Sequence, residues 1–126
     1  LMATMMPWDG NGLAERLSAL RASQPPLSAA VLATRTGLLL AAEADDGADT
    51  ETLAALGADL LASAEAPSRA LAGGPPREAT LRGASAHVIA LAAGETAVLV
   101  ALTDALTPTS SVLPDLREAA EDLAKL

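Results

Sequence analysis

Hydrophobic residues repeat every three or four positions near both ends of the chain, a spacing that predicts helices. The first of these segments ends at the pair Pro25–Pro26, which cannot continue a helix. The last follows a loop at 107–111 that is rich in Thr and Ser, and it includes Pro114, which a helix tolerates in its first turn. The apolar stripes consist of Leu13, Leu17 and Leu20 in the first helix and of Leu113, Leu116, Ala120 and Leu123 in the last.

A longer helix is predicted in the middle of the chain, where Asp49 or Thr50 can cap its first turn. Pro67 is expected to kink or end this helix, and one further turn fits before the breaker cluster at 73–76. Leu61 and Ala58 widen its apolar stripe into a broad face. The stripe itself consists of Leu53, Leu56, Leu60 and Ala64.

Five shorter segments have the pattern of strands, either alternating or apolar on both faces. They are Leu27–Thr34, Leu38–Ala42, Glu78–Arg82, His87–Ala92 and Thr96–Thr103. A turn at Gly37 joins the first two into a hairpin, and short turns join the last three into a meander. Only Glu78–Arg82 alternates cleanly between apolar and polar residues, as an edge strand does. Hairpins predict an antiparallel sheet, and strands that are apolar on both sides require helices on both faces.

Length and composition indicate one domain, residues 9–126, preceded by a tail at 1–8. The net charge of −8 makes nucleic acid and anionic membrane surfaces unsuitable partners. The chain has no Cys, which excludes disulfides and thiolate metal sites. No basic leader precedes Arg16, and no uncharged run is long enough to span a bilayer. We therefore expect a soluble cytoplasmic protein.

The segment Ala30–Ala41 (AVLATRTGLLLA) and the Ala- and Leu-rich helix from Leu53 resemble the Roadblock/dynein light chain domain family. The resemblance extends over roughly residues 11–126. It implies an α/β fold of the α+β type, a Roadblock-like five-stranded antiparallel sheet of order 2-1-5-4-3 with helices on both faces. Longin and profilin-like folds share parts of this architecture. The chain departs from the family pattern at Pro67, which lies within the expected span of the middle helix.

Members of this family commonly form homodimers by pairing their third strands and laying their middle helices side by side. Bacterial members, which are MglB-like, often bind small Ras-type GTPases of the MglA type. An unpaired edge strand and a broad helix face also fit such a dimer physically, because a partner strand can satisfy the exposed backbone groups. The residues expected at this interface are Leu53, Ala54, Leu56, Ala58, Leu60 and Leu61 of the helix and Thr80, Leu81 and Arg82 of the edge strand.

Candidate catalytic and metal-binding groups are few. Gly83–His87 has part of a nucleophile-elbow pattern, but Ser85 lies between two strands instead of in a strand-to-helix turn. His87 is the only His, which argues against a metal site. The acidic residues at 43–51 lack the spacing of a calcium loop and are expected to be a solvated loop and a helix N-terminus. We therefore expect no catalytic, cofactor-binding or metal-binding residues.

The remaining hypotheses concern binding. The first is a non-catalytic homodimeric regulator or scaffold that binds a small Ras-like GTPase and could modulate its nucleotide cycle. An arginine supplied to that partner would come from the exposed candidates Arg35, Arg69, Arg77 and Arg82, although surface roles are the simpler interpretation for each. The alternative is a small-molecule sensing module of related fold, which needs a pocket on which polar groups converge.

Overall fold

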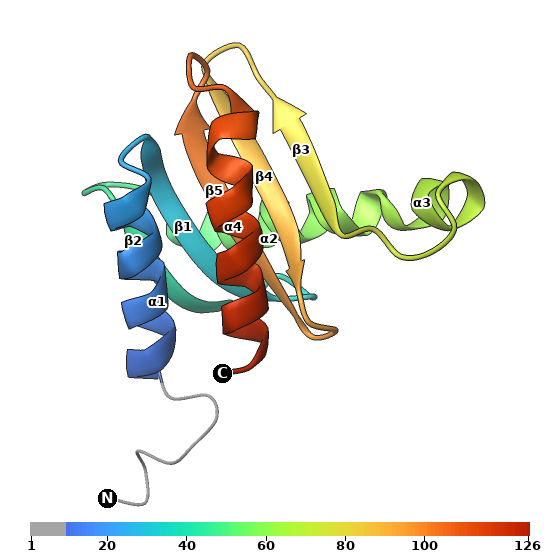
Figure 1. Cartoon of the computed structure of the whole chain (residues 1–126), viewed down its shortest axis with the longest axis horizontal. Helices are drawn as coiled ribbons and strands as arrows, with labels where there is room; N and C mark the ends of the chain where they lie inside the picture. The colour runs from blue at the N-terminus through green and yellow to red at the C-terminus, as the bar shows by residue number, and fades with distance from the viewer. Residues whose placement is uncertain (1–9) are drawn as a thin grey trace, which may run out of the picture.

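The computed structural model describes residues 10–126, so the predicted tail at 1–8 lies outside the described part of the chain. Five strands form one antiparallel sheet in the order β2-β1-β5-β4-β3 (Figure 1). This order and pairing confirm the predicted fold. The strands are β1 (Leu27–Thr34), β2 (Leu39–Ala44), β3 (Glu78–Arg82), β4 (Ala86–Ala93) and β5 (Ala97–Asp104).

Helices cover both faces of this sheet, as predicted. The described helices are α1 (Gly10–Ser23), α2 (Thr50–Ser63), α3 (Glu65–Leu71) and α4 (Thr109–Ala124). α1 and α4 lie side by side on one face, and α2 crosses the other (Figure 1). β5 is the middle strand, so Leu99 and Ala101 pack under α1 and α4 while Val98 and Val100 pack under α2. The central strand β5 thus contributes side chains to two apolar cores, one on each face of the sheet.

The predicted strand bounds agree closely with the structure. β1 and β3 begin and end where the pattern predicts, and the other three strands differ by one or two residues at their ends. Asp49 caps α2 by accepting a hydrogen bond from the Thr52 amide at 3.1 Å, which confirms one of the two predicted caps. The prediction that Pro114 lies in the first turn of the last helix is wrong. The backbone is extended at Pro108, and α4 already begins at Thr109. Pro114 therefore lies in the second turn.

Pro67 determines where α2 ends. It has no N–H to donate to the carbonyl of Ser63, four residues earlier, and its ring crowds that carbonyl. α2 accordingly ends at Ser63, and α3 begins at Glu65 with Pro67 in its first turn, where a missing N–H costs little. No residue of α3 is buried, and α2 is the only described element that it contacts. α3 therefore extends away from the sheet (Figure 1).

Gly57 allows α2 to lie directly on the central strand. A Cβ atom at this position would lie 2.4 Å from both Cγ atoms of Val100 on β5. No real side chain tolerates that distance, so only glycine fits here without moving the helix or the strand. Gly57 is buried and faces the sheet together with Ala54, Ala58 and Leu61. Small residues thus bring the backbone of α2 close to the sheet.

An ion pair connects the edge strand β3 to α4, on the face of the sheet that α2 does not cover. Arg117 of α4 donates two hydrogen bonds to Glu78 of β3, from Nε to Oε2 at 3.0 Å and from Nη2 to Oε1 at 2.7 Å. These bonds lower the pKa of the Glu78 carboxyl below its ordinary value. A carboxyl with a lowered pKa stabilises the fold at any pH above its unfolded-state pKa, and this contribution is lost as the pH falls through the folded-state pKa.

We therefore expect Glu78→Gln to lower the free energy of unfolding at pH 7 by a small amount, because the pair is partly exposed. The difference between variant and wild type should shrink as the pH falls below the ordinary pKa of Glu and through the lower folded-state pKa of Glu78, because the wild-type carboxyl then also becomes neutral. Urea denaturation at several pH values measures this. A difference that does not depend on pH would show that the charge of Glu78 contributes nothing.

Candidate protein-binding surface

β3 leaves one side of its backbone without a partner strand. It is the last strand of the sheet and pairs only with β4 in the described part of the chain. Thr80, Leu81 and Arg82 are exposed, and 56% of the Leu81 surface is accessible to solvent. Ala79 packs in the core beneath α2, so by alternation Leu81 lies on the α2 side of the sheet. A free edge with a solvent-exposed leucine is a suitable surface for another strand.

The opposite edge of the sheet, β2, is less suited to pairing. Its register with β1 shifts between Leu32 and Ala33, which marks an irregularity in the ladder. Irregular ladders are a common way to protect an edge strand from association. β3 pairs with β4 in one unbroken register from Glu78 to Arg82. Of the two edges, β3 therefore presents the more regular template.

The structure divides the predicted helix residues of the interface into two groups. Ala54, Ala58 and Leu61 are buried against the sheet in the single chain, and their place at an interface stays a prediction. Leu53 and Leu60 are half-buried, and Leu56 is 60% exposed. By helical spacing, Leu53, Leu56 and Leu60 share one side of α2, and α2 as a whole contacts β3. Whether a partner covers them stays a prediction.

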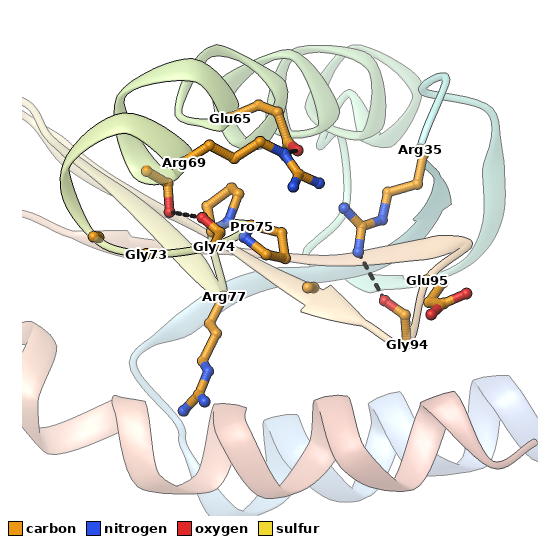
Figure 2. Close-up of a pocket in the computed structure, with 13 residues that line it drawn as sticks. Arg35, Glu65, Arg69, Gly73, Gly74, Pro75, Arg77, Gly94 and Glu95 are labelled. Atoms are coloured by element: carbon orange, nitrogen blue, oxygen red, sulfur yellow. Dashed lines mark hydrogen bonds and ion pairs between the residues drawn. The ribbon is translucent and has the colours of Figure 1, made fainter.

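Three of the four arginines named from the sequence line one pocket. Arg35, Arg69 and Arg77 line a cavity of about 850 Å³ at the end of the sheet, between α3 and the turn that joins β4 to β5 (Figure 2). Arg82 is not among its lining residues. The pocket brings together segments far apart in the chain, which is why the sequence pattern did not reveal it.

Ser85 and His87 do not form a catalytic arrangement with a described partner. Ser85 is exposed in the turn before β4, whereas His87 lies on β4 and is only 4% exposed. The buried Nδ1 atom of His87 has no hydrogen-bond partner within residues 10–126, so nothing orients the ring as a general base. No group of three acidic or His side chains in these residues could hold a metal ion. No described helix is long and apolar enough to cross a bilayer.

Residues 13–103 match the Roadblock/LC7 domain family. The chain belongs to this family. The resemblance seen in the first hairpin and the middle helix is thereby confirmed. No curated protein matches the sequence.

Solved structures place this Roadblock domain near MglB proteins. An MglB with a tetrameric arrangement is 28% identical, with a TM-score of 0.82 over 91% of this chain and 87% of the other. The gliding protein MglB from Thermus thermophilus is 27% identical, with a TM-score of 0.80 over the same shares. MglB of Myxococcus xanthus is 19% identical, with a TM-score of 0.80 over 93% and 88% of the two chains, and this likeness concerns the fold alone.

Proposed function

We propose that this Roadblock domain is a non-catalytic regulator that acts as a homodimer and binds a small Ras-like GTPase of the MglA type. The family match and the two MglB structures that are 27% and 28% identical support the class of function. The net charge of −8 fits a protein partner better than nucleic acid. The proposal assigns no catalytic residue to this chain.

The observation that carries the proposal is the free, regular edge of β3 beside the exposed side of α2. Two copies related by a two-fold axis can pair their β3 strands in an antiparallel ladder, which continues the sheet from one copy into the other. Leu81 and Leu56, which are mostly exposed in the single chain, would then lose their contact with water. Burial of these leucines favours the dimer by the hydrophobic effect.

Binding to a GTPase tests the proposal directly. A small Ras-like GTPase encoded near this chain is purified and loaded either with GDP or with a non-hydrolysable GTP analogue, and each form is mixed with the Roadblock protein. We expect a complex by size-exclusion chromatography with light scattering, and its stability should depend on the nucleotide, because a regulator must distinguish the two states.

The rates of GTP hydrolysis and of nucleotide release, measured with and without the Roadblock protein, then show which step is changed. An increase in either rate supports a regulator. No complex with either nucleotide form, together with unchanged rates, would contradict the proposal.

A further inference from the structure

The pocket at the end of the sheet brings together arginines from segments that lie far apart in the chain. The chain has 16 acidic and 8 basic residues, yet Arg35, Arg69 and Arg77 line this one cavity, together with only two acidic residues, Glu65 and Glu95. We call this cavity the arginine pocket. Its volume of about 850 Å³ falls within the range typical of small-molecule sites. Basic side chains therefore outnumber acidic ones in the lining of this pocket, although the protein as a whole is acidic.

Arg35 is held in place by the backbone. Its Nε donates to the carbonyl of Ala97 at 3.1 Å and its Nη2 donates to the carbonyl of Gly94 at 2.7 Å (Figure 2). These bonds use two of the five N–H groups of the guanidinium. Arg35 forms no ion pair with any residue in the range 10–126. The Arg35 guanidinium is thus held in position by the backbone and not by an ion pair, although Glu65 and Glu95 line the same pocket.

Arg69 faces Arg35 from the other side of the pocket. Figure 2 shows the two side chains extending into the same space, one from α3 and one from the β1–β2 turn, whereas Arg77 extends away from them. Arg69 pairs with Glu65 one helical turn earlier. The side chains of Arg69 and Glu65 are 61% and 41% exposed, and pairs with this much exposure contribute little to stability. An anion with two charges can therefore compete with Glu65 for Arg69.

The wall of the pocket is a turn that glycine and proline keep in position. Ser68 Oγ donates to the carbonyl of Gly74 at 2.7 Å, which ties the α3–β3 connection back to α3 (Figure 2). Pro75 and Pro76 follow and restrict the backbone, and Pro76 is buried. The wall is therefore held in shape without a ligand, as small-molecule sites usually are.

We infer that the arginine pocket binds a small ligand through a phosphate group placed between Arg35 and Arg69. The planar guanidinium matches a phosphate in geometry, and each can donate two parallel hydrogen bonds to it. A phosphate has up to two negative charges, whereas the Glu65 carboxylate has one. Arg69 therefore gains electrostatic attraction when it exchanges Glu65 for a phosphate that Arg35 also contacts. The inference does not depend on the proposed GTPase partner.

Titration with inorganic phosphate tests this inference. The full chain in a phosphate-free buffer is followed by thermal unfolding and by isothermal titration calorimetry, with sodium chloride at matched ionic strength as the reference. We expect phosphate to raise the melting temperature above the chloride reference. A nucleoside triphosphate in a second titration distinguishes a site for free phosphate from a site for a larger phosphorylated ligand, which should bind more tightly. No effect of either compound beyond that of chloride would overturn the inference.

Two substitutions should change phosphate affinity in opposite directions. Arg69→Gln removes one arm of the site and is expected to weaken binding on the order of tenfold. Glu65→Gln removes the competing carboxylate and should strengthen binding. Arg16→Gln and Glu15→Gln make the same changes of charge on α1, outside the pocket, and should leave the affinity unchanged.

Arg35→Gln should also weaken phosphate binding, but it removes bonds to the β4–β5 turn and can therefore affect folding as well. The described hydrogen bond of Arg69 goes to the Glu65 side chain and not to the backbone, so Arg69→Gln is the more decisive variant. Equal affinity in wild type, Arg69→Gln and Glu65→Gln would contradict the assignment. An equal change in the α1 control variants would show an effect of net charge only, which also contradicts it.

Discussion

Leu81→Lys is expected to convert the proposed homodimer into monomers without unfolding the chain. The Leu81 side chain is 56% exposed in the single chain, so lysine is tolerated there, but in a β3–β3 pair the two ammonium groups would be buried near each other. Light scattering should show the mass falling from that of two 12.6-kDa chains to that of one. Leu56→Lys should weaken the dimer for the same reason.

Leu106→Lys provides the matched control. Leu106 is 93% exposed and lies in the connection between β5 and α4, and β4 separates β5 from β3. The same change of charge and side chain there should leave the mass unchanged. A dimer that survives both Leu81→Lys and Leu56→Lys, or that dissociates equally with Leu106→Lys, would exclude the β3 edge as the interface.

Gly57→Ala is expected to destabilise the fold although alanine is the better helix former. The new Cβ would lie 2.4 Å from the Cγ atoms of Val100, so α2 or β5 must shift. Overpacking of this kind typically costs more than the helix propensity gains, and we expect a net loss of about 1–2 kcal/mol. Urea denaturation measures the loss as a lower midpoint with an unchanged slope.

A double-mutant cycle with Val100→Ala shows whether this contact is the cause. Val100→Ala removes both Cγ atoms, so the double variant should lose less stability than the sum of the single variants, with a coupling of about 1 kcal/mol or more. Gly12→Ala is the control, because a Cβ there has no neighbour within 4 Å, and it should not destabilise the fold. Additive losses at Gly57 and Val100 would contradict the close-contact explanation.

The sequence predicts the fold well because its pattern is locally unambiguous. Runs such as Leu27–Thr34 are apolar on both faces and have no strong helix signal, and turn residues separate them. Gly37 illustrates the agreement, since its φ of 95° lies in the region that the predicted hairpin turn requires. The close approach at Gly57 was not predicted, although an isolated glycine within a helix pattern is itself a signal of tight packing.

The candidate surface was predicted only in part. Leu56 and Leu61 have the same chemistry and lie five positions apart, yet one is exposed and the other is buried, because the sheet covers only one side of α2. Periodicity alone does not tell which side of a broad apolar face a partner would cover. The arginine pocket is a different case, since Arg35 and Arg69 lie near each other only through the long-range pairing of the sheet and the break before α3.

Cross-linking through single cysteines tests the β3 interface most directly, because the natural chain has no cysteine. Thr80 is the middle residue of β3, so in a two-fold antiparallel pair it lies next to its own copy, within the Cα separation that a disulfide needs. Mild oxidation of Thr80→Cys should give covalent dimers in this register, Ala79→Cys and Leu81→Cys test registers centred one residue to either side, and Leu106→Cys should not link. Absence of linked dimers at all three β3 positions, or equal linking at Leu106, would contradict a dimer formed through β3.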